Sequence, residues 1–142
     1  MPQSRMFVHK IQIQLYHTDA AGILFYSRLF DLAFEAFNAF LQSLNISVAW
    51  IIRESDFLMP YVHAEADYLI PLKVGDEVVF HLKIERIGNS SFVVHYAVHL
   101  GDQTAATIKT VHVTIDKLGK HKIDLPEKLR QALESYFYLS ES

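Results

Sequence analysis

A carboxylate and a nearby glycine, Asp19 and Gly22, stand at the beginning of the stretch Tyr16–Gln42, which carries the longest helix signal of the chain. An aspartate can act as a nucleophile, or as a base on water, when hydrogen-bond donors stabilise the oxyanion that forms on a carbonyl. The residues that follow Asp19 offer main-chain N–H groups at the expected helix start, where the helix dipole favours negative charge. Gly22 permits a close approach of the backbone to a ligand. This set of groups suits attack on a carbonyl carbon.

The alternative interpretation of Asp19 is structural, because aspartate commonly caps a helix or an Asx-turn. His17, two residues earlier, can contact a substrate or can be an ordinary loop histidine. Asp31 and Glu35 lie one helical turn apart, and paired carboxylates can do acid–base work, although a solvated or subunit-facing stripe is the simpler interpretation. Asp19 is therefore the leading candidate for chemistry.

Two groups of polar residues on expected strands raise the question of a metal site. They are His63, Glu65 and Asp67 on one strand and His95 and His99 on another. The chain has no cysteine and no His-Glu-x-x-His spacing, which are common sources of metal ligands. We therefore expect no metal ion and no redox cofactor.

The candidate residues lead into a helix that is expected from Ser27 onward. Its polar residues recur every three or four positions and so form one narrow stripe. They are Ser27, Arg28, Asp31, Glu35, Asn38 and Gln42. The rest of the circumference is apolar, which makes the helix too apolar to lie on a surface by one face. Other elements must wrap it.

Five further segments alternate polar and apolar residues in the way that is typical of strands. They are Met6–Tyr16, Pro60–Pro71, Glu77–Ile87, Phe92–Leu100 and Thr104–Asp116. In the first, the expected inner face is Phe7, Ile11, Ile13 and Leu15. In the second, Val62, Ala64, Ala66, Tyr68 and Ile70 alternate with a single wet face. In the third and fourth, the expected inner residues are Val78, Phe80, Leu82, Ile84, Phe92, Val94, Tyr96, Val98 and Leu100.

Turns and short helices complete the pattern. Gly75-Asp76, Gly88-Asn89 and Gly101-Asp102 tolerate the positive φ of tight turns and predict that the last three strands form a meander of hairpins. Ser47–Glu54 is expected to be a short helical piece. Pro126 suits the first turn of a closing helix with one apolar stripe.

The order of these elements is strand, long helix, four strands and short helix. It predicts an α+β fold in which one antiparallel five-stranded sheet curls around the long central helix, with a C-terminal helix added. A length of 142 residues suits a single domain, residues 1–142.

Composition narrows the class of protein further. The net charge is −3 and no face gathers Lys and Arg, so we expect no nucleic-acid partner. Hydrophobic residues make up 51% of the chain, but charges break every apolar run well short of a membrane span of roughly 18–20 residues, so we expect no membrane partner. The N-terminal residues show no secretory signal, which favours a cytoplasmic location.

The segment His17–Phe30, HTDAAGILFYSRLF, resembles the motif of the 4-hydroxybenzoyl-CoA thioesterase-like family of the hotdog fold. Weaker similarity runs through Pro60–Val78 and Ser90–Val98, so the resemblance covers most of the chain except the C-terminal helix. The Asp-Ala-Ala-Gly form is similar both to 1,4-dihydroxy-2-naphthoyl-CoA thioesterases and to general short acyl-CoA thioesterases. The motif does not separate these two groups.

The resemblance implies a set of site residues. It makes Asp19 the catalytic carboxylate and the main-chain N–H at Tyr26 the donor to the thioester carbonyl. Substrate contacts are expected at His17, Gly22, Phe25, His63, Arg86 and Ser91. Phe25 and Tyr26 either line the acyl pocket or are simply core aromatics.

The chain departs from the family where coenzyme A phosphates are expected to bind. Some members carry a basic run before the strand that starts here at Ser91, whereas this chain has Gly88-Asn89-Ser90 preceded only by Arg86. The candidates that could replace this basic run are Arg86, Lys73, Lys109 and the group Lys117, Lys120 and Lys122.

The resemblance implies an acyl-CoA thioesterase that hydrolyses an aromatic thioester, such as 1,4-dihydroxy-2-naphthoyl-CoA, or a short acyl thioester. A non-catalytic module that binds acyl-CoA or an acyl carrier in the same pocket is the alternative. A hotdog dehydratase is disfavoured because its His-Asp-x-Asn-like signature is absent. Hotdog relatives pair as dimers or dimers of dimers with each acyl site completed by a neighbouring subunit, so we expect a homo-oligomer, specifically a homotetramer.

Overall fold

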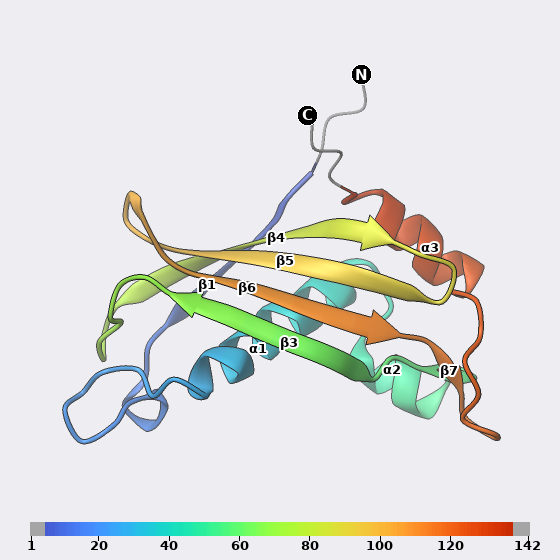
Figure 1. The fold of residues 1–142 in the computed structure, drawn as a ribbon, viewed down its shortest axis with the longest axis horizontal. Helices are drawn as coiled ribbons and strands as arrows, with labels where there is room; N and C mark the ends of the chain where they lie inside the picture. The colour runs from blue at the N-terminus through green and yellow to red at the C-terminus, as the bar shows by residue number, and fades with distance from the viewer. Residues whose placement is uncertain (1–4, 138–142) are drawn as a thin grey trace.

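A five-stranded antiparallel sheet is wrapped around one long helix in the computed structural model, which describes residues 5–137 (Figure 1). The long helix α1 spans Arg28–Ser43 and lies behind the sheet in Figure 1. The strands are β1 (Phe7–Gln12), β3 (Tyr61–Tyr68), β4 (Glu77–Ile87), β5 (Ser91–Leu100) and β6 (Gln103–Val113). Their order across the sheet is β1-β4-β5-β6-β3, so the first strand joins the later four as predicted.

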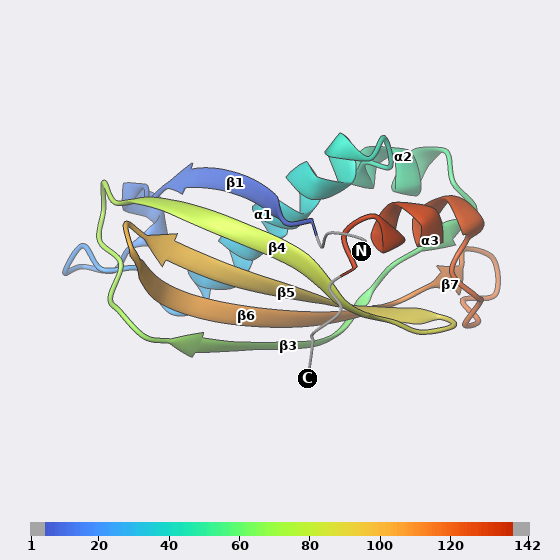
Figure 2. The same ribbon diagram turned by 90° about the horizontal axis from the view of Figure 1, so that it is seen from above.

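The core lies between α1 and the inner face of the sheet (Figure 2). The inner residues predicted for β4 and the first four predicted for β5 are at most 1% exposed, which confirms the alternation there. α1 buries one broad stripe of apolar residues against them: Leu29, Leu32, Ala33, Ala36, Phe37, Phe40 and Leu41. Burial of this size is the main source of stability, at about 25 cal/mol per Å² of apolar surface.

Smaller elements close the ends of the core. α2 spans Val48–Arg53, and its cap residue Ser47 accepts a hydrogen bond from the N–H of Trp50 at 3.1 Å. Two short strands, β2 (Phe57–Leu58) and β7 (Ile115–Asp116), pair with each other. β2 was not predicted, and β7 is the end of the predicted strand Thr104–Asp116, which breaks after Val113.

The closing helix α3 spans Glu127–Glu134 after Pro126, as predicted, and buries Leu129 and Leu133. Among residues 5–137, no helix is long and apolar enough to cross a membrane.

Three details of the sequence prediction are wrong. The first strand ends at Gln12 because residues Leu15–His17 form a 3-10 turn, which leaves Leu15 74% exposed instead of buried. Gly75 and Gly101 adopt positive φ, but Gly88 does not.

The strand β3 also differs from the prediction. It was expected to have one wet face, yet Val62 is 57% exposed and Tyr68 is 47% exposed on the other face. The reason is position, because β3 is an edge strand of the sheet and borders β6 on one side only.

Candidate active site

The Asp19 loop, residues 18–24, is a tight hairpin-like turn that precedes α1 (Figure 1). Thr18 bridges Leu24, the N–H of Asp19 donates to the C=O of Ile23 at 2.9 Å, and the N–H of Gly22 donates to the C=O of Asp19 at 3.0 Å. Gly22 has a φ of +77°, a left-handed value that residues with a side chain adopt only with strain. The glycine of the motif is therefore required by backbone conformation.

The carboxylate of Asp19 folds back onto this loop. Its Oδ1 accepts hydrogen bonds from the N–H groups of Ala21 at 2.8 Å and Ile23 at 3.3 Å, so the Asx-turn role considered above is present. Within residues 5–137, Oδ2 has no hydrogen-bond donor, and the side chain is exposed. One oxygen thus fixes the orientation of the carboxylate, and the other stays open to a ligand.

The expected placement of this loop at the helix start is wrong. α1 begins only at Arg28, and the N–H groups of Ala21 and Ile23 point to the Asp19 carboxylate instead of to a ligand. The loop is tied to the segment before β4, because the N–H of Leu24 donates to the C=O of Leu72 at 2.7 Å. The segment before β4 therefore positions Asp19 more directly than the helix does.

Tyr26 lies between the Asp19 loop and α1 and is 67% exposed. Within the described part of the chain, its N–H and that of Ser27 have no acceptor. The C=O of Tyr26 accepts a hydrogen bond from the phenol of Tyr68 on β3. These two free N–H groups lie immediately before the first residue of α1, and unpaired main-chain donors suit an oxyanion.

A cavity of about 320 Å³ opens beside Tyr26. It is lined by Ile23, Leu24, Tyr26, Leu29, Tyr68, Leu69, Ile70, Pro71, Leu72, Ala105 and Ala106, and we call it the Tyr26 cavity. Phe25 is 45% exposed and lies outside this lining, although its ring is 4.9 Å from that of Tyr26. The Tyr26 cavity is the space nearest to the free N–H groups.

A second cavity of about 290 Å³ lies at the other end of β3. It is lined by Phe34, Phe37, Leu41, Val48, Ile51, Ile52, Leu58, Met59, Pro60, Tyr61 and Ile115, and we call it the Tyr61 cavity. The phenol of Tyr61 is the one polar side chain in this lining, and burial raises its pKa to about 12. An apolar cavity with a single hydrogen-bond donor suits an aromatic ligand.

His17 is 5% exposed, and its Nδ1 accepts a hydrogen bond from the N–H of Gln14 at 2.8 Å. Burial lowers the pKa of His17, and the carboxylates of Glu35 and Asp31 oppose this only in part. The neutral ring thus anchors the 3-10 turn that leads into the Asp19 loop.

Asp31 and Glu35 do not act as a pair. The carboxylate of Asp31 binds Arg28 at 3.0 Å, while that of Glu35 lies 3.8 Å from Nε2 of His9.

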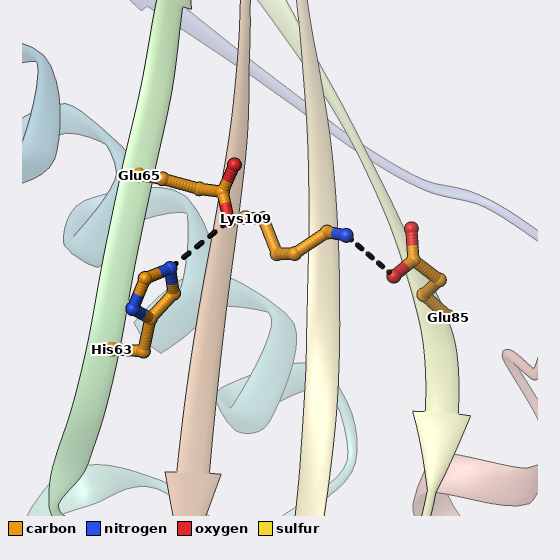
Figure 3. Close-up of polar contacts among 4 residues, drawn as sticks. All are labelled: His63, Glu65, Glu85 and Lys109. Carbon is orange, nitrogen blue, oxygen red and sulfur yellow. Dashed lines mark hydrogen bonds and ion pairs between the residues drawn. The ribbon is translucent and has the colours of Figure 1, made fainter.

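His63 lies on the outer face of the sheet, which is the face turned away from α1 (Figure 3). Its Nε2 is 3.0 Å from Oε1 of Glu65, and the Nζ of Lys109 reaches across β5 to Oε2 of Glu85 at 3.2 Å. Within residues 5–137, no three His, Cys, Asp or Glu side chains come together as metal ligands. Lys109, one of the candidates for binding coenzyme A phosphates, is therefore already paired with Glu85 on this face.

Arg86 and Ser91 flank the β4–β5 hairpin, which lies at the opposite end of the sheet from the Asp19 loop (Figure 1). This hairpin is bound to α3, because Arg130 donates to the C=O of Gly88 at 2.7 Å. Within one chain the structure therefore does not bring Arg86 or Ser91 to Asp19.

Two lysines considered for the phosphates behave differently. Lys73 bridges Ile23 through its main chain, and its exposed side chain is beside the Asp19 loop. Lys117 is occupied, because its Nζ donates to the C=O groups of Ile52, at 2.8 Å, and of Ser55. Lys73 is thus the candidate cation nearest to the expected chemistry.

Sequence reasoning missed Tyr68, which it treated as one of the apolar residues of a strand. Its phenol reaches the main chain of Tyr26, which is 42 positions away. No motif in the sequence signals such a contact.

A sheet wrapped around a central helix, with a carboxylate loop and free N–H groups before that helix, defines a hotdog-fold protein of the thioesterase type. Residues 13–133 match the thioesterase-like superfamily, and this range includes the Asp19 loop, Tyr26, α1 and all strands of the five-stranded sheet except β1. This chain belongs to that superfamily.

Individual relatives are similar over most of their length. A protein of Rippkaea orientalis (strain PCC 8801 / RF-1) named 1,4-dihydroxy-2-naphthoyl-CoA hydrolase is 33% identical over 126 residues, which cover 87% of this chain and 91% of the relative. A protein of the same name from Nostoc punctiforme is 30% identical over 129 residues, covering 91% and 87%. The crystal structure of a 1,4-dihydroxy-2-naphthoyl-CoA thioesterase from Synechocystis superimposes with a TM-score of 0.85 at 29% identity, over 91% of this chain and 96% of that one.

Proposed function

We propose that this chain is an acyl-CoA thioesterase that hydrolyses an aromatic acyl thioester of the 1,4-dihydroxy-2-naphthoyl-CoA type, with Asp19 as the catalytic carboxylate. The observation that carries the proposal is the similarity to hydrolases of that name, at 30–33% identity over most of the chain. The open Oδ2 of Asp19 and the nearby free N–H of Tyr26 supply the chemical groups that such a reaction needs.

In this mechanism the thioester carbonyl carbon lies beside Asp19 Oδ2, and the carbonyl oxygen accepts a hydrogen bond from the N–H of Tyr26. Asp19 either attacks the carbon itself, forming an anhydride that water then cleaves, or removes a proton from a water molecule that attacks. In both routes the C–S bond breaks, the thiolate of coenzyme A leaves and takes up a proton, and the acid is released. Tyr26 N–H stabilises the negative charge that develops on the oxygen.

We also propose that the active form is a homo-oligomer in which β3 of one chain pairs with β3 of another. β3 is an edge strand, and seven of its eight residues are exposed. Phe34 on α1 is 44% exposed next to it, with its ring 6.4 Å from that of Tyr61. A bare, partly apolar sheet edge readily pairs with another chain, and a two-fold axis makes such a pair antiparallel.

That pairing has a consequence for the site. Tyr68 and the Tyr26 cavity lie at one end of β3, and the Tyr61 cavity lies at the other end. An antiparallel pair sets the Tyr26 cavity of one chain beside the Tyr61 cavity of its partner. Asp19 and Tyr26 then come from one chain, and the apolar space for the acyl group comes from the other. A dimer of such dimers gives the expected tetramer.

The assembly can be tested with Ala64→Lys, which places a charge on the exposed edge strand. We expect light scattering to give a smaller mass for this variant than for the wild type, with activity reduced in parallel. Leu118→Lys is the matched control, because Leu118 is fully exposed and lies outside β3. A wild-type mass equal to one chain, with full activity at high dilution, would contradict the shared site.

Hydrolysis itself is tested by incubating the wild-type protein with a panel of acyl-CoA thioesters and a thiol reagent. Release of free coenzyme A, fastest with 1,4-dihydroxy-2-naphthoyl-CoA, is the expected result. Binding of acyl-CoA without release of thiol would instead identify a non-catalytic binding module. Faster release from short aliphatic substrates would overturn the aromatic assignment while keeping the thioesterase.

A further inference from the structure

Tyr68, the last residue of β3, reaches out of the sheet to the main chain in front of α1. Its phenol donates a hydrogen bond to the C=O of Tyr26. Tyr68 itself is held by the sheet, because it pairs with Ala106 and the next two N–H groups along the chain both donate to the C=O of Ala105, at 2.8 and 3.0 Å. The hydrogen bond therefore joins an exposed loop to a fixed strand.

The two peptide groups on either side of the Tyr26 Cα are both held. The one before it is fixed by the C=O of Phe25, which accepts a hydrogen bond from the N–H of Arg28 at 2.9 Å. The one after it is fixed by the C=O of Tyr26 itself, through Tyr68. Removing the phenol would release the second peptide group and allow rotation about the Cα–C bond of Tyr26, which turns the N–H of Ser27 relative to that of Tyr26.

The bond has an electronic effect as well. The C=O of Tyr26 and the N–H of Ser27 belong to the same peptide group, and that N–H has no acceptor within residues 5–137. A donor on the carbonyl polarises the peptide group and strengthens the hydrogen bond that its N–H can give. Tyr68 thus polarises the free N–H of Ser27 and fixes its direction relative to the free N–H of Tyr26.

We propose that Tyr68 is a positioning residue for the thioester reaction, and that its hydroxyl holds the Tyr26 main chain so that the free N–H groups meet the carbonyl oxygen. The proposal rests on the proposed function, because it assigns the oxyanion to these N–H groups. A preorganised donor acts without reorganisation during the reaction, and small misplacements of reacting groups are costly. The structure provides this preorganisation from a strand remote in sequence.

The first test is Tyr68→Phe, which removes only the hydroxyl. We expect kcat to fall about tenfold, less than the roughly 10²–10³ that follows loss of a whole oxyanion donor, with KM changed less than twofold because the ring still lines the Tyr26 cavity. Tyr16→Phe is the matched control, since Tyr16 is 74% exposed and its hydroxyl has no hydrogen bond within the described residues. We expect Tyr16→Phe to retain wild-type kcat.

A spectroscopic test separates positioning from a general loosening of the fold. On an Asp19→Asn background, which leaves the thioester uncleaved, the carbonyl stretch of bound benzoyl-CoA reports how strongly the N–H groups polarise it. We expect the added Tyr68→Phe change to move this stretch back toward its value in free solution, with equal ligand affinity. A lowered affinity with an unmoved carbonyl stretch would show that Tyr68 only shapes the cavity.

The outcomes distinguish this inference from the proposed function. If the wild type releases coenzyme A and Tyr68→Phe retains wild-type kcat, the positioning role is wrong and the thioesterase stands. If the wild type releases none from any acyl-CoA, the proposed function fails and the positioning role fails with it.

Discussion

Two regions of the molecule hold polar groups by hydrogen bonds, and they differ in what can reach them. In the Asp19 loop, an exposed carboxylate is fixed by one oxygen, and the N–H of Tyr26 is free. In the sheet interior, the Tyr96 phenol bonds the hydroxyl of Thr110 at 3.0 Å, and this hydroxyl lies 2.9 Å from Nε2 of His112. We call these three hydrogen-bonded side chains the buried chain, and each of them is at most 1% exposed.

The difference shows that residue type alone does not define a site. The ring of His112 stacks between Phe37 and Phe92, with centroids 4.7 and 4.9 Å away, and burial lowers its pKa to about 4 although the Met59 main chain opposes this. Such a histidine remains neutral near pH 7 and is inaccessible to solvent and ligands. The buried chain therefore contributes to stability, whereas the open loop can do chemistry, and the variants below separate these roles.

The largest effect is expected from removing the free donor of the loop. Tyr26→Pro eliminates the main-chain N–H and should lower kcat by about 10²–10³, whereas Tyr26→Phe keeps the N–H and should be mild. Steady-state kinetics of both variants check this difference. Circular dichroism and ligand binding must first show that the proline variant is folded, because proline also restricts the backbone.

The opposite result for the phenylalanine variant would reassign the site. If Tyr26→Phe loses as much activity as the proline variant, the phenol is the working group and the N–H is not. The hydroxyl of Tyr26 would then act in the reaction, whereas the hydroxyl of Tyr96 in the buried chain would keep a structural role.

The next effect concerns the buried chain and appears in stability. The pKa of His112 is lowered from 6.5 to about 4 on folding, so the unfolded chain binds a proton first. The contribution of neutral His112 to the free energy of unfolding is complete above about pH 6.5 and is lost as the pH falls toward 4. Between pH 7.5 and 5.0 this amounts to about 2 kcal/mol of unfolding free energy.

Urea unfolding of the wild type and of His112→Gln at both pH values measures this term. We expect the wild type to lose about 2 kcal/mol more than the variant on acidification. Comparison of the two losses removes the contributions of His17, His81 and His95, whose pKa values burial also lowers. Equal losses would show that His112 does not govern the acid sensitivity of the core.

The smallest effect is expected at the edge of the loop, where Lys73 lies beside Gly22. If its ammonium meets a coenzyme A phosphate, Lys73→Met should raise KM for acyl-CoA by up to about fivefold, the size of an exposed ion pair. KM for the matching acyl-pantetheine, which lacks the nucleotide, should stay unchanged. Arg86→Met is the comparison variant, and a larger rise in KM there would move the phosphates to the β4–β5 hairpin.

The regular part of the fold could be predicted because one face of each central strand is buried. The alternation in β4 and β5 identified Val78 and Phe92 as core residues, and both are 0% exposed. Leu15 was predicted wrongly because the strand ends at Gln12, whereas the alternation of polar and apolar residues continues past that end.

The site was predictable only in part. The Asp-Ala-Ala-Gly motif located the loop, since Gly22 needs its positive φ there. Sequence could not place the loop against Leu72, nor Tyr68 against Tyr26, because these contacts join segments that only the folded sheet brings together. Arg86 and Ser91 were grouped with Asp19 by resemblance, and in one chain they lie at the far end.

The rate of coenzyme A release by the wild type and by Asp19→Asn, measured side by side with 1,4-dihydroxy-2-naphthoyl-CoA, tests the central claim most directly. Asparagine preserves the shape of the side chain and the Oδ1 that accepts from Ala21, so the loop should remain folded. It removes the carboxylate, and we expect kcat to fall at least about a hundredfold while substrate binding persists. Near-wild-type release by the folded variant would contradict the assignment of Asp19 as the catalytic carboxylate.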